Sequence, residues 1–97
     1  MTVNVIIEGT LKEGERENFT GICTEAFIAT RAFDGCQSID LVYNSEKQNN
    51  WLFNEVWDSG EHYQKYLQFR TEDGTLDAIA SMCEDAPSIR IFDIIPT

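Results

Sequence analysis

The chain has 97 residues, of which 42% are hydrophobic, 11% aromatic and 25% charged. This composition predicts a single globular domain over residues 1–97 rather than a disordered segment. There are 7 Lys and Arg residues against 17 Asp and Glu, so the formal net charge is −10. A charge of this sign repels phosphate backbones and anionic lipids, which argues against nucleic acids and membrane surfaces as partners.

The sequence also bears on location and on metal binding. No apolar run approaches the roughly 20 residues that a membrane helix needs, and the start of the chain does not resemble a secretion signal. The three cysteines, Cys23, Cys36 and Cys83, are odd in number and lack the spacing of zinc ligands. We therefore expect a cytoplasmic protein with reduced thiols, no disulfide and no metal site.

The first third of the chain predicts a strand followed by a helix. Val3–Ile7 is a short apolar strand segment. After a polar stretch, side chains recur with the three- and four-residue spacing of a buried helix face. These residues are Phe19, Ile22, Cys23, Ala26, Phe27 and Thr30, with Phe33 three positions further on. Asp34 and Gly35 are expected to end this helix, because glycine adopts the left-handed conformation at little steric cost.

The middle of the chain predicts a β-hairpin. In the segment 37–45, Ile39, Leu41 and Tyr43 alternate with other residues, as in a strand. Residues 47–50 form the expected turn, and a second strand follows over residues 51–57. One face of this second strand carries Trp51, Phe53, Glu55 and Trp57. An acidic side chain therefore lies in the middle of an otherwise aromatic strand face.

The last part of the chain predicts two helical segments and a closing strand. Asp58 and Glu61 have the spacing of a capping box that starts a helix. One side of this helix carries Tyr63, Tyr66, Leu67 and Arg70. After a break near residues 71–74, a shorter helical piece carries Leu76, Ile79, Ala80 and Cys83 on one side and ends before Pro87. Residues 88–95 have the pattern of a strand.

The predicted order of elements is β-α-β-β-α-β. This order is typical of an α+β ferredoxin-like sandwich, in which two helices cover one face of a four-stranded antiparallel sheet. The other face of such a sheet is bare, yet the strands carry apolar side chains on both faces, for example Val5 beside Ile6 and Ile91 beside Phe92. Because an apolar face of this size must be covered, we expect a homodimer that packs sheet against sheet.

Three segments of the chain resemble a known family. They are residues 11–14 with Phe19, residues 30–36, and above all Glu55–Tyr63, with the sequence EVWDSGEHY. Their order and spacing over nearly the whole chain are similar to those of the antibiotic biosynthesis monooxygenase domain, a family of dimeric α/β barrels. The resemblance implies a cavity between the helices and the sheet of each subunit.

For the characterised enzymes of this family, the resemblance implies oxygenation of flat phenols such as anthrones or quinols, without metal, flavin or other cofactor. A substrate that becomes an electron-rich carbanion can itself reduce oxygen, so the protein need only supply a base, a polar group and a water-poor wall. The expected partners are a small hydrophobic aromatic molecule and oxygen. We predict Glu55, His62 and Tyr66 as catalytic residues. The predicted substrate-binding residues are Trp57, Tyr63, Phe53 and Phe27.

The chain departs from the family pattern at one position of the second helix. Many members carry a histidine nine residues after the tryptophan that corresponds to Trp57, and Tyr66 stands there. The only histidine, His62, lies one helical turn earlier on the same face. Proton transfer has therefore moved to His62, been taken by Tyr66, or been lost. Haem-degrading members use an asparagine on the first strand, and Ile7 at the matching position argues against haem.

Glu55 leaves two interpretations open. A carboxylate between Phe53 and Trp57 cannot be buried in its charged form without a partner. Either a structural hydrogen bond or ion pair holds it, for example with Arg90 or Arg31, or it is a general base whose pKa is shifted by burial. Two functions follow: an oxygenase of small phenols or quinols, and a non-catalytic dimeric module that binds a hydrophobic metabolite or lipid in the same cavity.

Overall fold

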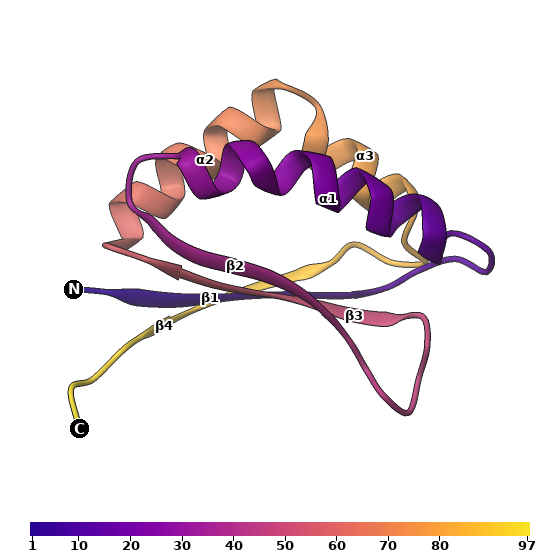
Figure 1. Cartoon of the computed structure of the whole chain (residues 1–97), viewed down its shortest axis with the longest axis horizontal. Helices are drawn as coiled ribbons and strands as arrows, with labels where there is room; N and C mark the ends of the chain where they lie inside the picture. Colours follow the sequence, from indigo (N-terminus) through magenta and orange to yellow (C-terminus); the bar gives the residue numbers. More distant parts are fainter.

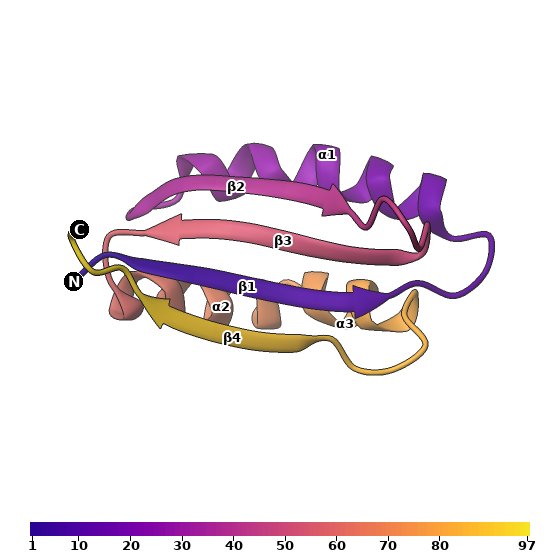
Figure 2. The same ribbon diagram turned by 90° about the horizontal axis from the view of Figure 1, so that it is seen from below.

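The computed structural model describes all residues 1–97 and shows two layers, a four-stranded sheet and a layer of helices. The strands are β1 (Val3–Thr10), β2 (Cys36–Tyr43), β3 (Asn50–Trp57) and β4 (Ser88–Asp93). They pair antiparallel throughout, in the order β2-β3-β1-β4 (Figure 2). The prediction of an α+β ferredoxin-like fold is therefore confirmed.

Three helices cover one face of this sheet (Figure 1). They are α1 (Arg16–Ala32), α2 (Gly60–Glu72) and the short α3 (Thr75–Ser81). None of them combines the length and the apolar composition needed to cross a membrane.

The two faces of the sheet follow from the alternation of side chains along each strand. On β3, Trp51, Phe53, Glu55 and Trp57 are all buried beneath the helices, as the sequence predicts. On the neighbouring strand β1, Val5 pairs with Glu55 and is also buried. The core therefore lies between the sheet and the helices, and Glu55 is inside it.

The other face of the sheet is open to solvent and mixed in character. Val42 on β2 and Phe92 on β4 remain 46% and 48% exposed. Between them, Asn4 donates a hydrogen bond to Asn54 Oδ1 at 2.8 Å. The predicted apolar side chains are present on this face, but polar groups interrupt them.

The loop between α1 and β2 depends on a glycine. The buried stripe of α1 is Phe19, Cys23, Phe27 and Thr30, and the helix ends at Ala32. Gly35 then adopts a positive φ of 90°. A Cβ atom there would lie 2.4 Å from Cγ of His62, so only glycine fits beside the imidazole.

The predicted cap of α2 is wrong by one residue. Ser59, not Asp58, is the N-cap, and its Oγ accepts a hydrogen bond from the backbone N–H of His62 at 3.2 Å. Asp58 instead accepts a hydrogen bond from Gln37 Nε2 at 2.8 Å. Ser59 has the extended backbone of an N-cap, so its short hydroxyl reaches the first free amide groups of the helix.

Several strand ends also differ from the prediction. β1 continues to Thr10, well beyond Ile7. β2 ends at Tyr43 rather than residue 45, because the Asn44 side chain accepts a hydrogen bond from the backbone of Glu46 and starts the turn. β4 ends at Asp93 rather than residue 95.

Candidate functional site

A small cavity lies between the helices and the sheet, at the centre of the molecule. Side chains from β1, β3, α1, α2 and α3 line it, and 11 of its 14 lining residues are hydrophobic. The polar exceptions are Glu55, Arg70 and Thr75. Its volume of about 20 Å³ is close to the minimum that holds one water molecule. The cavity is therefore closed and largely apolar.

Glu55 reaches this cavity from the middle of β3. Its side chain is 1% exposed, and Oε1 accepts a hydrogen bond from Trp57 Nε1 at 2.9 Å. Burial raises the pKa of the Glu55 carboxyl to about 7, and the hydrogen bond from Trp57 offsets only part of this rise. At neutral pH the group therefore exchanges readily between its acid and its base form, as a general base requires.

Neither arginine considered as a partner pairs with Glu55. Arg31 donates a hydrogen bond to the backbone carbonyl of Ile39 at 2.9 Å. Arg90 forms an ion pair with Glu8 at 3.0 Å on the open face of the sheet. The carboxyl group of Glu55 therefore has no arginine partner, and its one hydrogen bond comes from Trp57, which is the structural hydrogen bond of the first interpretation.

Tyr63 places a second unusual group at the cavity. Its side chain is fully buried, and its hydroxyl has no hydrogen-bond partner among the groups of the protein. The ring packs edge-on against Trp57, with centroids 5.8 Å apart. Burial and the nearby charge of Glu55 raise the pKa of the hydroxyl, so it stays protonated and able to donate. A buried donor of this kind favours a ligand with an acceptor atom.

Tyr66, by contrast, belongs to a fully bonded cluster. Its hydroxyl lies 2.6 Å from Thr30 Oγ1 and accepts a hydrogen bond from Arg70 Nε at 2.9 Å. Arg70 also donates to the carbonyl oxygen of Ala26 at 2.6 Å and to Asp73 at 3.0 Å. Burial raises the pKa of Tyr66, while the hydrogen bonds from Thr30 and Arg70 partly lower it. The cluster holds the Tyr66 ring in a fixed position at the cavity wall.

The sequence did not single out Arg70 as a functional residue. It lies on the same helix stripe as Tyr66, four residues further on, so the two side chains were expected to meet. Arg70 is 6% exposed, which is rare for an arginine unless it is paired. The sequence signal that could have identified Arg70 is a charged residue on the buried stripe of a helix.

His62 lies outside the cavity. Its side chain is 34% exposed, Nδ1 is 2.7 Å from Ser59 Oγ, and Nε2 is 3.7 Å from Asp34 Oδ2. These contacts fasten the first turn of α2 to the loop that contains Gly35. In this structure the imidazole is a surface group near the helix start.

The remaining predicted residues divide into two groups. Phe27, Phe53, Tyr63, Tyr66 and Glu55 meet at the cavity. Trp57 is fully buried but lies behind Glu55, where its indole N–H holds the carboxyl group. The structure therefore brings together a base, two phenol groups and two aromatic walls, which is a set able to bind a phenolic molecule and remove a proton from it.

The sequence matches the family described as antibiotic biosynthesis monooxygenase over residues 2–71. The chain therefore belongs to the antibiotic biosynthesis monooxygenase family. No curated protein matches it by sequence.

Solved structures share the fold at low sequence identity. A conserved protein from Methanosarcina mazei Go1 superposes with a TM-score of 0.90 at 13% identity, over 98% of this chain and 94% of that chain. An antibiotic biosynthesis monooxygenase gives a TM-score of 0.85 at 16% identity, over 97% and 99%. SnoaB, a cofactor-independent oxygenase from Streptomyces nogalater, gives 0.84 at 14% identity, over 99% and 95%.

Proposed function

We propose that this protein is a cofactor-independent monooxygenase of a small, flat phenol or quinol, with molecular oxygen as co-substrate. The observation that carries the proposal is Glu55, a carboxyl group with a near-neutral pKa in the wall of an apolar cavity. The free hydroxyl of Tyr63 beside it gives the same cavity a hydrogen-bond donor. Membership of the family and the fold shared with SnoaB support this reaction class.

In the proposed reaction, the Glu55 carboxylate takes a proton from the activated carbon of an anthrone-type substrate and leaves an enolate. The enolate gives one electron to oxygen, and the two radicals combine into a peroxide anion on the same carbon, which takes the proton back from Glu55 and becomes a hydroperoxide. Loss of water then breaks the O–O bond and the remaining C–H bond, which leaves a carbonyl group. One oxygen atom enters the product and the other leaves as water, so the substrate supplies all four electrons.

Two groups of the cavity would stabilise the negative charge that develops on the substrate oxygen. The Tyr63 hydroxyl has a free donor and no competing partner in the protein. The second group is Tyr66 at the same wall: the Arg70 charge is paired with Asp73, but the hydrogen bond from Arg70 lowers the pKa of the Tyr66 hydroxyl and makes it a stronger donor. Because apolar side chains exclude water, each of these interactions is stronger there than in solution.

The test is oxygen uptake with anthrone, with isotopically labelled oxygen to follow the product. The wild-type protein should insert one labelled atom and exceed the rate of spontaneous oxidation. Glu55→Gln keeps an acceptor for Trp57 but removes the base, so kcat should fall about 100-fold or more. Glu8→Gln on the open sheet face is the matched control and should leave the rate unchanged. Equal uptake with and without the protein would refute the proposal.

A second function is favoured by one observation, the engaged state of Tyr66. Its hydroxyl is held between Thr30 and Arg70, so the group at the usual histidine position is not free to shuttle protons. A non-catalytic dimeric module would use the same cavity to bind a hydrophobic metabolite or lipid. It would carry a co-purified apolar molecule, detected by extraction and mass analysis, and would bind anthrone without oxygen uptake.

We also propose that the open sheet face forms a homodimer, sheet against sheet. Val42, Phe92 and Ile94 are exposed large apolar side chains of the sheet and its C-terminal extension. A second copy would remove them from water, each contributing in proportion to the apolar area buried.

A further inference from the structure

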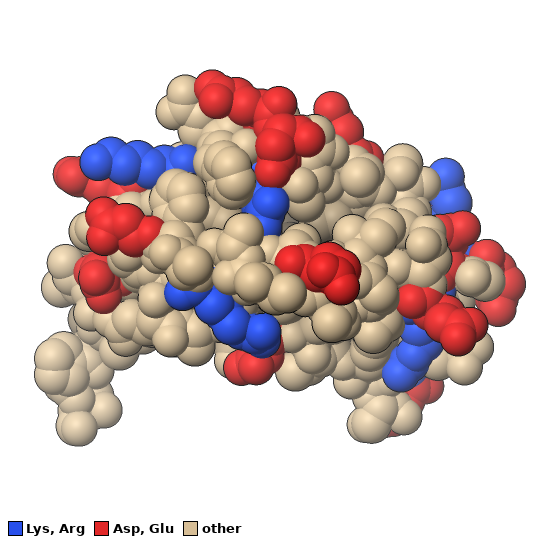
Figure 3. Space-filling view, turned by 45° about the horizontal axis from the view of Figure 1, so that its top comes forward, with Lys and Arg blue, Asp and Glu red and all other residues tan.

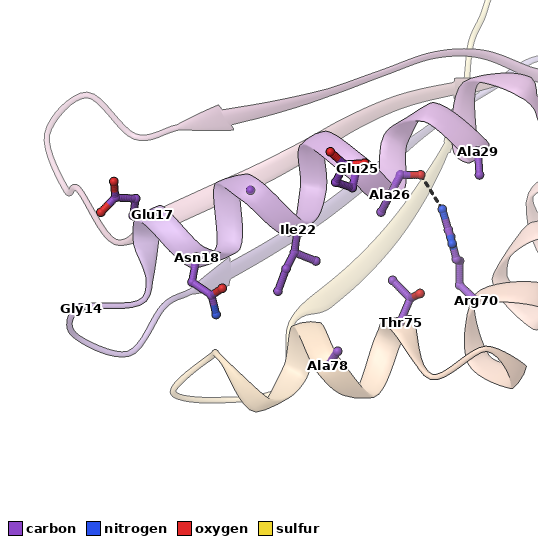
Figure 4. A pocket seen from close by; sticks show the side chains of 11 residues that line it. Gly14, Glu17, Asn18, Ile22, Glu25, Ala26, Ala29, Arg70, Thr75 and Ala78 are labelled. Carbon is purple, nitrogen blue, oxygen red and sulfur yellow. Dashed lines mark hydrogen bonds between the residues drawn. The ribbon is translucent and has the colours of Figure 1, made fainter.

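A groove of about 840 Å³ runs along the outside of the molecule between α1 and the helices α2 and α3, and we call it the α1–α3 groove. Small residues, including Gly21 on α1 and Ala78 on α3, leave it open. Figure 4 shows Ile22 of α1 pointing toward Thr75 and Ala78 of α3. The groove is accessible from solvent, in contrast to the closed cavity.

The groove and the cavity share one wall. Four residues line both: Ile22, Ala26, Arg70 and Thr75. Arg70 is fixed in this wall, because it bonds to the Ala26 carbonyl (Figure 4) as well as to Tyr66 and Asp73. The Ile22 side chain is held by packing alone. Opening the wall at Arg70 would break these hydrogen bonds, whereas opening it at Ile22 would break none.

The size of the cavity requires such an opening. A cavity of about 20 Å³ accommodates roughly one water molecule, whereas binding sites for small organic molecules usually have about 300–1,000 Å³. The α1–α3 groove has a volume in the latter range. An aromatic ligand can therefore reach Glu55 only if the shared wall moves aside, and a substituent at its far end then lies in the groove.

An independent feature of the cavity indicates a ligand. The Tyr63 hydroxyl is fully buried, lines the cavity and has no partner in the protein. Leaving such a donor unpaired costs about 1–3 kcal/mol. A ligand oxygen on the cavity side of the wall would satisfy it.

The charges of the groove restrict what can lie in it. Glu17 and Glu25 stand on α1 along the groove, are exposed, and form no ion pair. The positive charge of Arg70 is already matched by Asp73 at 3.0 Å. Figure 3 shows acidic side chains spread widely over the side of the molecule that includes the helices. The groove therefore repels carboxylates and attracts amines.

We propose that the α1–α3 groove and the buried cavity are two parts of one ligand site. The phenolic end of the ligand meets Tyr63 and Glu55, and a neutral or positively charged extension lies in the groove. This inference rests on the proposed function and specifies its substrate class: a flat phenol whose far end carries no anionic group.

Binding of three naphthols to the whole protein tests this proposal. One is unsubstituted, one carries an aminomethyl group on the far ring, and one carries a carboxylate at the same far-ring carbon. Their dissociation constants are measured by equilibrium dialysis at low ionic strength. The wild-type protein should bind the aminomethyl compound at least fivefold more tightly than the carboxylate.

Gly21→Trp is designed to fill the groove: a Cβ at Gly21 meets no atom within 4 Å, so the backbone there leaves room for the start of a side chain. The matched control is Ile28→Trp, on the same helix at a side chain that is 65% exposed and outside the groove. Circular dichroism and thermal unfolding verify the fold of both variants. Gly21→Leu is a smaller block to be used if the tryptophan variant does not fold.

Gly21→Trp should weaken the binding of the aminomethyl compound about tenfold and the binding of the unsubstituted naphthol less than threefold. Ile28→Trp should change neither dissociation constant. If Gly21→Trp lowers the affinity for the aminomethyl compound less than twofold, the groove is not part of the site. That result, with naphthol binding still sensitive to Tyr63→Phe, would overturn this inference and leave the proposed function standing. If the wild-type protein binds no naphthol at all, the proposed function fails and this inference fails with it.

The charge of the groove is tested separately. The double variant Glu17→Gln, Glu25→Gln should reduce the preference for the amine over the carboxylate by about fivefold or more, because it removes both negative charges that line the groove. The control Glu46→Gln, Glu84→Gln changes the net charge equally at exposed positions outside the groove and should keep the preference. Equal effects of the two double variants would show that net charge alone sets the preference, which would overturn the assignment of the amine to the groove.

Discussion

Asn54 and Glu55 are neighbours on β3, yet they lie on opposite faces of the sheet and in opposite environments. Asn54 is exposed and accepts a hydrogen bond from Asn4 at 2.8 Å. Glu55 is buried among aromatic rings and accepts one from Trp57 at 2.9 Å. Water solvates the first polar group and is excluded from the second. The face of the sheet on which a polar side chain lies therefore decides whether water solvates its polar group or whether burial changes the properties of that group, such as the pKa of Glu55.

The same contrast extends across the sheet. The helix-covered face holds the small apolar cavity with its buried acid. The open face combines exposed Phe92 with the ion pair between Glu8 and Arg90, a mixture typical of a protein contact surface. If both proposals hold, one sheet binds a ligand on its covered face and a second copy on its open face, so substitutions on one face should leave the function of the other intact.

The largest expected effect is the pH dependence of stability caused by Glu55. The folded protein keeps the Glu55 proton up to about pH 7, whereas an unfolded glutamate releases it near pH 4.5. Between these values the folded state binds more protons, so this group lowers the free energy of unfolding as pH rises. The loss reaches about 3 kcal/mol above pH 7.

Urea unfolding of the wild type and Glu55→Gln across this range measures that loss. The difference in stability between the variant and the wild type should grow in favour of the variant as pH rises. Glu8→Gln, which changes a carboxylate on the open face, is the matched control for losing a carboxylate outside the core. A flat difference for Glu55→Gln would mean that water reaches the carboxyl group in the folded protein.

The next effect concerns the open face. Phe92→Asp should weaken the proposed dimer about 100-fold, because it places a charge where two apolar faces meet. Analytical ultracentrifugation would then show the monomer at concentrations where the wild type is dimeric. Ile28→Asp introduces the same charge at an exposed site on α1 and should keep the dimer. A wild type that is monomeric at micromolar concentration would rule out the dimer.

Much of the helix-covered face was predictable from the sequence. The alternation along residues 51–57 placed Glu55 among aromatic side chains, and the helical stripe placed Tyr63 and Tyr66 facing it. These periodicities identify a face because they follow directly from strand and helix geometry. They predict the fold and the polar groups that reach the core.

The partners of those groups were not predictable in the same way. Tyr66 contacts Thr30, whereas the Tyr63 hydroxyl has no partner. Both facts depend on side-chain positions across two helices, and the spacing of residues within one helix does not determine these positions. The place of His62 depends on the close approach of Gly35 from a distant loop. The volume of the cavity likewise depends on how all three helices pack, so the family resemblance implied a cavity but not its size.

A smaller effect is expected from Tyr63→Phe. Removing a hydroxyl that has no partner should leave the free protein as stable as the wild type or about 1 kcal/mol more stable, because the buried donor is no longer unsatisfied. The same change should weaken the binding of a naphthol about tenfold. Urea unfolding and equilibrium dialysis measure the two effects. Tyr66→Phe is the contrast: it removes the acceptor of Arg70 Nε and the hydroxyl contact of Thr30 inside the protein, and it should destabilise the protein by about 1–3 kcal/mol.

The smallest effect on activity is expected from His62→Ala, which alters the solvent side of α2. His62 is 34% exposed and contacts Ser59 and Asp34 rather than the cavity, so oxygen uptake with anthrone should change less than threefold. Stability should fall by about 1 kcal/mol or less, since the Ser59 hydroxyl still caps the helix through the backbone N–H at position 62. Ser59→Ala, which removes that cap and leaves the cavity untouched, calibrates the purely structural cost. A folded His62→Ala protein with kcat reduced more than tenfold, beside an active Ser59→Ala, would show that the imidazole reaches the substrate during turnover and that Glu55 does not act alone.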